Sequence, residues 1–138
     1  MATPKRPAKD MKLGKRTTAL KAVLDAMPGA VGAPMTSATG TIPLVLLYKV
    51  MGKMFAILSV REEEFVILKC DPHLAEIMRE KYTGVGHRTH LDRRFWISVD
   101  LDSDVPPAEV KRLVAHSYEQ VCAKLTARQK AELSALSK

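Results

Sequence analysis

The segment GHRTHLDRRFW, residues 86–96, concentrates side chains that could do chemistry. It holds two histidines, three arginines and the only tryptophan of the chain. Imidazoles can bind a metal ion or move protons, whereas guanidinium groups bind phosphate or carboxylate oxygens through paired hydrogen bonds. The segment is therefore a candidate for a metal site, a catalytic centre or a surface that binds an acidic partner.

His87 and His90 have a spacing that can place two metal ligands on one side of a helical turn. The surrounding sequence instead indicates an extended segment, in which positions three apart face opposite sides of a sheet. No third ligand follows nearby, because Asp92 can as easily pair with Arg93 or Arg94. Since two ligands do not close a structural site, we predict no metal site and expect surface or partly packed histidines.

Nucleophilic catalysis needs a serine or cysteine beside a positioned base, and His116 with Ser117 comes nearest to this. Adjacent helical residues point about 100° apart, so these two side chains do not face each other. Asp100, Asp102 and Asp104 could share protons or bind a divalent ion. Their position favours ending a strand and capping the next helix. We predict no catalytic residue, no cofactor and no enzymatic activity.

Basic and aromatic residues near two turns remain as the candidate binding surface. One turn is expected to bring together Arg88, His90, Arg93, Arg94 and Trp96, and the Met51-Gly52 hairpin is flanked by Lys49 and Lys53. Guanidinium groups bind phosphate oxygens bidentately, and a hairpin is narrow enough to enter a groove of DNA or lie along its backbone. Trp96 could stack on a base or pack in the core. The arginines could also be solvated charges that pair with Asp92 and with glutamates. The predicted nucleic-acid-binding residues are Lys49, Lys53, Arg88, His90, Arg93, Arg94 and Trp96.

The net charge of +7 suggests an acidic partner, but most of it lies at the N-terminus. Residues 1–16 carry six basic residues and one acidic residue, which is +5 and leaves +2 for residues 17–138. A short segment rich in lysine and proline predicts a flexible, solvated basic arm. Such an arm can hold a polyanion or simply increase solubility.

The composition predicts one soluble domain. The chain has 138 residues, of which 46% are hydrophobic and 27% are charged. No window has the length of apolar sequence that a membrane helix or a signal peptide needs, so we expect a cytoplasmic protein. Cys70 and Cys122 lie in apolar stretches without metal-site or disulfide spacing, which indicates buried, reduced thiols.

Hydrophobic periodicity predicts the elements that must position the candidate residues. Three apolar runs separated by short turns indicate an antiparallel meander, with Met51-Gly52 as a hairpin turn. Asp71-Pro72 is typical of a helix start, and residues 32–43 are expected to form a loop. Predicted helices cover residues 17–27, 71–84, 106–125 and 126–136, and predicted strands cover 44–50, 53–60, 65–70, 85–91 and 95–101.

This order predicts a single α+β domain over residues 17–138. An antiparallel sheet carries helices packed on one face, in the order α-β(3)-α-β(2)-α with an extra C-terminal helix. Residues 95–101 alternate, so one face of the strand should be buried. Phe95, Ile97, Val99 and Leu101 should point to one side, and Trp96, Ser98 and Asp100 to the other.

Four stretches resemble the MmcQ/YjbR family of small bacterial proteins: KVMGKMFAILSV at 49–60, LKCDPHLAEIMREKY at 68–82, HLDRRFWISVDLDSDVPP at 90–107 and HSYEQVCAKL at 116–125. The resemblance implies a CyaY-like or secretion-chaperone-like fold and binding to DNA, and it carries no defined catalytic residues. The chain departs from the family at TSATGTIP, where members have a Pro-Phe-Gly-Pro-like segment, and at His87-Arg88-Thr89, where they have a Pro-Gly-Tyr-like turn.

These observations lead us to expect weak, mainly electrostatic binding to the phosphate backbone of DNA, helped by the basic arm and without catalysis. The alternative is a protein-interaction or chaperone-like module, in which an exposed sheet face or an apolar groove holds a partner.

Overall fold

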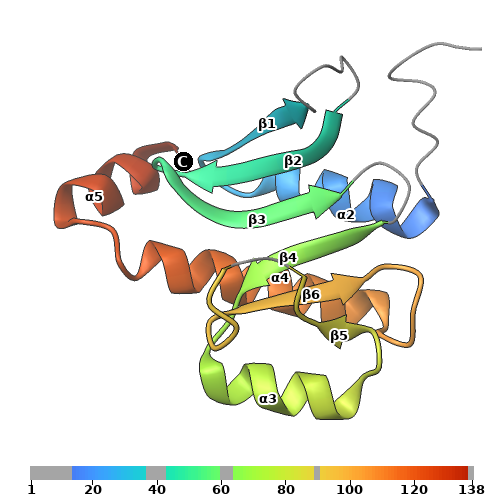
Figure 1. The fold of residues 1–138 in the computed structure, drawn as a ribbon. Coiled ribbons are helices and arrows are strands. Elements are labelled where there is room, and N and C mark those ends of the chain that lie inside the picture. The colour runs from blue at the N-terminus through green and yellow to red at the C-terminus, as the bar shows by residue number, and fades with distance from the viewer. Residues whose placement is uncertain (1–13, 37–42, 60–63, 89–90, 137–138) are drawn as a thin grey trace, which may run out of the picture.

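The computed structural model describes residues 14–36, 43–59, 64–88 and 91–136. Within these ranges, four helices accompany a six-stranded antiparallel sheet of order β1-β2-β3-β4-β6-β5 (Figure 1). The predicted α+β fold is confirmed. The helices are α2 Lys15–Ala26, α3 Pro72–Lys81, α4 Pro107–Cys122 and α5 Ala127–Leu136. The strands are β1 Ala30–Thr36, β2 Pro43–Val50, β3 Lys53–Ser59, β4 Phe65–Lys69, β5 Val85–Gly86 and β6 Trp96–Asp100.

The core lies between the sheet and the two helices α2 and α4, which run behind it in Figure 1. α4 buries the predicted stripe that includes Val110, Val114 and Val121. On β6, Ile97 and Val99 are fully buried, while Trp96 and Asp100 are only partly buried, as the alternation predicted. The prediction is wrong for Ser98, which is buried, and for Phe95, which is exposed. Phe95 belongs to the turn before β6, where its N–H donates to the Asp92 carbonyl oxygen. α3 packs against the β5 edge of the sheet (Figure 1). None of the helices in the described ranges is long and apolar enough to cross a membrane.

Local turn and cap chemistry agrees with the sequence. Met51 and Gly52 both have positive φ values, 49° and 82°, as a two-residue hairpin between β2 and β3 requires. The Asp71 carboxylate accepts hydrogen bonds from the backbone N–H of His73 and Leu74, and it therefore caps α3. Each of these predictions depends on residues that are neighbours in the chain.

The prediction of a loop over residues 32–43 is wrong for its first part, because β1 covers Ala30–Thr36. β1 is an edge strand that pairs with β2, with Gly32 opposite Tyr48 and Pro34 opposite Leu46. A Cβ at Gly32 would lie 2.7 Å from a ring carbon of Tyr48, so only glycine lets this ring pack against the strand. Proline is compatible with the outer side of an edge strand.

The predicted strand over residues 85–91 is shorter than expected, because β5 contains only Val85 and Gly86. These two residues pair with Val99 and Ser98 of β6. The chain then leaves the sheet and returns to it at Trp96. The described candidate residues between these points, Arg88, Arg93 and Arg94, therefore lie outside the strands.

Candidate nucleic-acid interface

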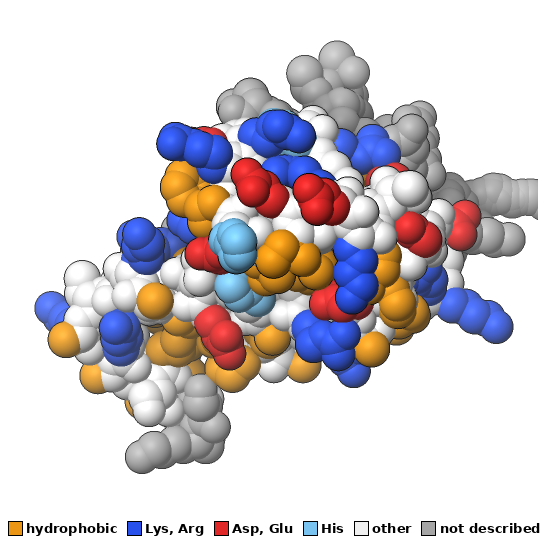
Figure 2. Space-filling model, turned by 90° about the horizontal axis from the view of Figure 1, so that it is seen from below, with side chains coloured by type: hydrophobic (Ala, Val, Ile, Leu, Met, Phe, Trp, Pro, Cys, Tyr) orange, Lys and Arg blue, Asp and Glu red, His pale blue; other side chains and the backbone are white. Residues whose placement is uncertain are grey.

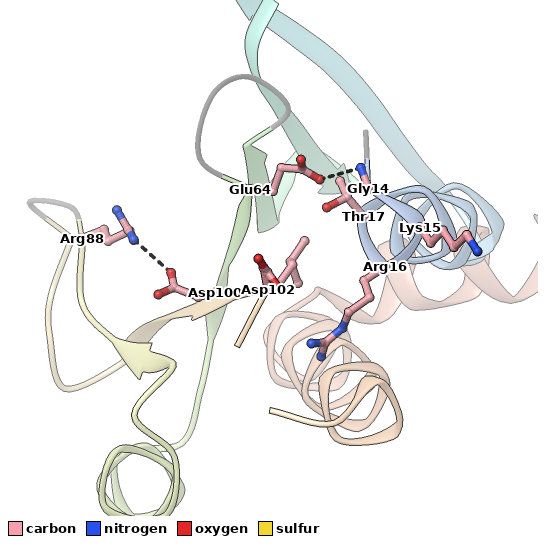
Figure 3. Close-up of a pocket in the computed structure, with 9 residues that line it drawn as sticks. Gly14, Lys15, Arg16, Thr17, Glu64, Arg88, Asp100 and Asp102 are labelled. Carbon is pink, nitrogen blue, oxygen red and sulfur yellow. Dashed lines mark hydrogen bonds and ion pairs between the residues drawn. The ribbon is translucent and has the colours of Figure 1, made fainter. Parts of the chain in front are cut away.

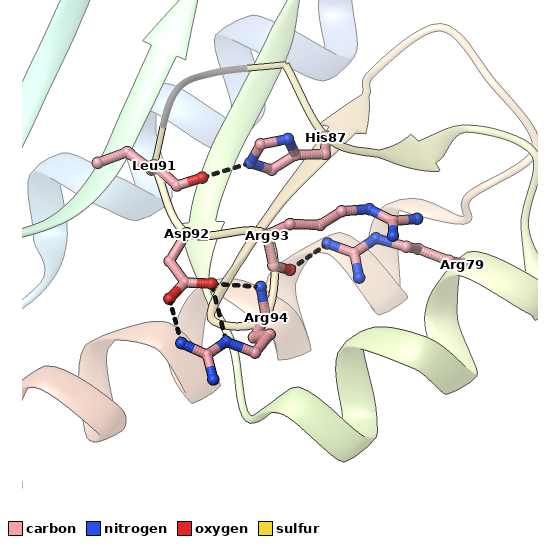
Figure 4. Close-up of polar contacts among 6 residues, drawn as sticks. All are labelled: Arg79, His87, Leu91, Asp92, Arg93 and Arg94. Carbon is pink, nitrogen blue, oxygen red and sulfur yellow. Dashed lines mark hydrogen bonds and ion pairs between the residues drawn. The ribbon is translucent and has the colours of Figure 1, made fainter.

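The turn before β6 is organised by Asp92. Its carboxylate accepts hydrogen bonds from the Arg94 backbone N–H at 2.9 Å and from the Arg94 side-chain atoms Nε at 3.2 Å and Nη2 at 2.8 Å (Figure 4). The side-chain bond from Arg94 is the main cause that lowers the pKa of Asp92 to about 2. Asp92 therefore neutralises Arg94, which agrees with the alternative that this arginine is a solvated, paired charge.

Arg88 lies apart from the other predicted arginines. Its guanidinium forms an ion pair with Asp100 at 2.9 Å and lies 4.4 Å from the ring centroid of Phe65. Asp100 stands opposite Phe65 at one end of β6, whereas Trp96 stands opposite Lys69 at the other end. Four residues of strand separate these ends by about 13 Å. The expectation that Arg88 shares one cluster with Arg93 and Arg94 is therefore wrong.

Arg79 of α3, which the sequence did not single out, lies beside Arg93. Its Nη2 donates to the carbonyl oxygens of Arg93 at 2.7 Å and Trp96 at 3.0 Å. Its Nε is buried and has no hydrogen-bond partner. Figure 4 shows the side chains of Arg79 and Arg93 extending next to each other. Burial, and then the cation of Arg93, lower the pKa of Arg79.

No carboxylate in the described ranges forms an ion pair with Arg79 or Arg93. Arg79 is partly buried and Arg93 is exposed. Two adjacent cations repel each other, and an anion bound beside them would reduce this repulsion. A pocket of about 500 Å³ opens at this point between α3 and the turn. It is lined by Pro72, Glu76, Arg79, Glu80, Arg93 and Arg94.

Trp96 lies on the outer face of the sheet, outside the core cluster. The Lys69 ammonium is 5.9 Å from its ring centroid, and the two residues are paired across β4 and β6. This cation–π contact keeps the Trp96 ring next to a positive charge. Trp96 is therefore placed where a base could reach it, and Lys69 is a second basic residue that the sequence did not single out.

Lys49 and Lys53 are exposed at the turn between β2 and β3. β3 begins and β4 ends at the same end of the antiparallel sheet, so these lysines lie at the end where Lys69 and Trp96 are found. We call this region the cationic end of the sheet. It comprises Lys49, Lys53, Lys69, Arg79, Arg93, Arg94 and Trp96. His90 lies outside the described residues.

Acidic side chains interrupt this surface. In Figure 2, which views the molecule from the α3 side, Lys and Arg side chains gather along the upper edge and Asp and Glu side chains lie directly beside them. Glu76 and Glu80 line the pocket next to Arg79. The cationic end is therefore a surface of mixed charge, in which acidic residues stand beside the arginines.

The residues considered for catalysis have structural contacts. Ser117 is buried, accepts a hydrogen bond from the Lys69 backbone N–H at 2.9 Å and donates to the Phe55 carbonyl oxygen. His116 Nε2 accepts from the Asp71 backbone N–H at 3.1 Å. These contacts join α4 to β3, to β4 and to the start of α3. They leave neither side chain arranged as a nucleophile with its base.

The acidic residues after β6 also differ from expectation. Asp104 accepts hydrogen bonds from the backbone N–H of Thr83 at 2.9 Å and Gly84 at 2.8 Å, which hold the turn after α3. α4 begins after Pro106 without a side-chain cap, so the prediction that these acids cap the next helix is wrong. In the described part of the chain, no group of three or more His, Cys, Asp or Glu side chains is arranged to hold a metal ion.

The described cysteines form no disulfide. Cys70 is buried, as the sequence predicted, and Cys122 is partly buried. Burial raises the pKa of the Cys70 thiol to about 11. A thiol with such a pKa stays protonated at neutral pH and is a poor nucleophile.

The fold and the site together define a small α+β domain with a cationic sheet end. The model of the YjbR family matches residues 26–120, so the chain belongs to this family. YjbR of Escherichia coli strain K12 is 36% identical over 73 residues, which are 52% of this chain and 62% of that protein. YbdF of Escherichia coli O157:H7 is 28% identical over 76 residues, which are 54% of this chain and 62% of that protein.

Two solved structures have a similar fold. Protein DR2400 of Deinococcus radiodurans, with the family-model domain DUF419, superposes with a TM-score of 0.72 at 25% identity, covering 97% of this chain and 92% of that one. A protein from Pseudomonas syringae superposes with a TM-score of 0.58 at 17% identity, covering 78% of this chain and 98% of that one. The second likeness concerns the fold alone.

Proposed function

We propose that this protein is a non-catalytic domain that binds the phosphate backbone of DNA weakly through its cationic end. The observation that supports this proposal is the pair of guanidinium groups of Arg79 and Arg93. They lie next to each other, and no described carboxylate forms an ion pair with either of them. A phosphate group bound beside the two guanidinium groups would offset the repulsion between these cations.

The width of the cationic end across the strands limits how many DNA phosphates it can contact. Three strand spacings separate β2 from β6, which is about 14 Å. A single DNA strand carries one phosphate per 3.4 Å of helix axis, so this width matches about four phosphates. The proposal accordingly predicts a slope of log K against log salt of about −3 to −4.

The same structure limits the affinity and the specificity. Asp92 neutralises Arg94, Asp100 neutralises Arg88, and Glu76 lies in the pocket beside Arg79. Contacts to phosphate carry no sequence information by themselves, and Trp96 could add only stacking on a base. The proposed interaction is therefore weak and non-specific. We expect it to take place in the cytoplasm, where bacterial DNA is found.

A titration of duplex DNA into the full chain at several salt concentrations tests the proposal. Replacing Arg93→Ala together with Arg94→Ala should flatten the salt dependence by about one to two contacts. Arg128→Ala is the control for the loss of an exposed arginine elsewhere, because the Arg128 side chain lies on α5, outside the cationic end, and is 90% exposed. Absent or salt-independent binding, or an equal loss with Arg128→Ala, would refute the proposal.

One observation favours a second candidate function, binding of a protein partner on the outer face of β1 and β2. Val31 and Leu136 have 66% and 65% of their surface exposed. With Ala33, Leu47 and Met51 among other residues, they line a groove of about 480 Å³. Large exposed apolar side chains that lie together mark interaction sites. Binding of a protein partner at this groove should be lost with Val31→Glu and should depend little on salt. Binding that is unaffected by Val31→Glu, or that weakens steeply with salt, would exclude this second function.

A further inference from the structure

A separate groove runs between α2 and α4 and has an apolar interior. Its volume is about 450 Å³. Leu20, Leu101 and Val110, which are almost fully buried, contribute to its lining. The small exposed side chains Ala19 and Ala22 also line it and leave room above the groove. The other lining residues are Lys15, Arg16, Val23, Pro107 and Lys111.

Arg16 joins the two sides of the groove at one end. Its guanidinium donates to the carbonyl oxygen of Ser103 at 3.2 Å and to that of Val105, both just before α4. Figure 3 shows the Arg16 side chain reaching from α2 toward this part of the chain. The first turn of α2 is thereby joined to the start of α4. These hydrogen bonds restrain the two walls of the groove relative to each other at this end, which reduces the ordering that a partner would have to impose.

The charge around the groove has one sign. Lys15, Arg16 and Lys111 contribute to its lining, and no aspartate or glutamate does. Among the described residues, Lys15 and Lys111 form no ion pair. An apolar interior with a cationic rim is complementary to a ligand with an apolar face and negative charges beside it.

We propose that this groove binds an amphipathic helix of another protein, with acidic residues along the border of its apolar face. Lys15 to Val23 span about 12 Å along α2, which is the length of two helical turns. Apolar side chains at i, i+3 or i+4, and i+7 of a partner helix would occupy this length. Its carboxylates would lie next to Lys15 and Lys111.

Charge argues against the two occupants that the protein itself could supply. Residues 1–13 carry four basic residues and one acidic residue, which is +3, so they would be repelled by the rim. A second copy of the chain would place the same three cations against each other. An acidic helix from another protein is the occupant that the charges favour.

This inference goes beyond the proposed function, because the groove and the cationic end lie at opposite ends of the molecule. α2 and α4 begin near the end of β6, whereas the cationic end surrounds the turn between β2 and β3 (Figure 1). Each site can therefore be changed by substitution without changing the other.

The test measures binding of a fluorescent peptide to the full chain. The probe is a helical peptide of about 16 residues with leucine at i, i+3, i+4 and i+7 and glutamate beside these positions. Ala19→Glu places a negative charge in the groove at an exposed position that tolerates a good helix former, and it should weaken binding about tenfold or more. Ala26→Glu is the matched control, because Ala26 is exposed on α2 outside the groove, and it should leave the affinity nearly unchanged.

Several results would overturn the inference. One is that a peptide of the same composition in scrambled order binds as tightly as the probe. Another is that Ala26→Glu weakens binding as much as Ala19→Glu does. A third is that the free protein forms a dimer that Ala19→Glu dissociates. Deletion of residues 1–13 should not raise the affinity; an increase of about tenfold would assign the groove to that segment. Binding to phosphatidylglycerol vesicles that Ala19→Glu abolishes would assign it to a membrane surface. Unchanged thermal unfolding of both variants excludes a folding defect as the cause of lost binding.

Discussion

The Nη2 atom of Arg79 donates a hydrogen bond of 2.7 Å to the carbonyl oxygen of Arg93, and the guanidinium groups of the two residues lie next to each other. α3 thus holds the turn before β6 by the same side chain that brings a second cation to Arg93. The Arg79 side chain therefore contributes both to the stability of this turn and to its positive charge. A substitution at Arg79 should therefore affect both folding and anion binding.

Arg79→Ala should lower the free energy of unfolding by about 1–3 kcal/mol, because the carbonyl oxygens of Arg93 and Trp96 lose a partly buried donor. Chemical denaturation followed by circular dichroism measures this change. The exposed Arg128→Ala should change the stability by less than about 0.5 kcal/mol. Equal effects of the two substitutions would mean that the Arg79 contact does not stabilise the turn.

Asp92→Asn should strengthen DNA binding, because it releases Arg94 from its ion pair and adds one free cation to the cationic end. The slope of log K against log salt should become steeper by about one contact. The matched substitution Asp102→Asn removes an exposed carboxylate near the opposite end of β6 and should leave the slope unchanged. An unchanged slope in Asp92→Asn would contradict a role for Arg94.

Acid should remove the contribution of Asp92 to stability over a defined pH range. Its pKa is about 2 in the folded protein, below the ordinary value of 3.8, so the unfolded chain binds the proton more tightly. The stabilisation is fully present above pH 4 and is lost as the pH falls from about 4 to about 2. NMR titration of the Asp92 carboxyl measures the pKa directly, and Arg94→Ala should return it toward 3.8. A pKa near 3.8 in the unchanged protein would contradict the ion pair.

Ser117→Ala should destabilise the fold by about 1–3 kcal/mol, because the Lys69 N–H and the Phe55 carbonyl oxygen would both lose their side-chain partner in the interior. Thermal unfolding measures this loss. Ser134→Ala, at an exposed position of α5, is the control and should have almost no effect. A neutral Ser117→Ala would show that a water molecule or a local shift replaces the hydroxyl.

Gly32→Ala should also destabilise the protein, by about 1–3 kcal/mol, because the new Cβ would lie 2.7 Å from the ring of Tyr48. The ring cannot move easily, since it is buried and its hydroxyl donates to Asp25 at 2.7 Å. Ala33→Ser, at the next and exposed position of β1, should be tolerated. Comparable melting temperatures for the two variants would contradict this packing.

Features encoded by neighbouring residues could be predicted from the sequence. The turn at Met51-Gly52 needs positive φ values and the cap at Asp71 needs a short acceptor, and both requirements are visible in a few letters of sequence. β1 could not be predicted in the same way, because its run of Gly, Ala and Pro shows no alternation. Its conformation depends on the partner strand β2 and on the ring of Tyr48.

In the candidate site, too, only the features that depend on neighbouring residues could be predicted from the sequence. The outward position of Trp96 followed from the alternation of β6, which is a local property. The separation of Arg88 from Arg93 depends on where β5 ends, and the approach of Arg79 depends on how α3 packs. Both are consequences of contacts between residues far apart in the sequence, and no local pattern contains them.

The edge strands β1 and β5 determine how easily a further strand could pair with the sheet. Pro34 interrupts the row of backbone N–H donors on β1, and β5 offers only two residues at the opposite edge. An added strand would therefore find one backbone donor fewer along β1 and only two residues to pair with on β5. Both features reduce the tendency of the sheet to lengthen by edge pairing, which is a route to aggregation.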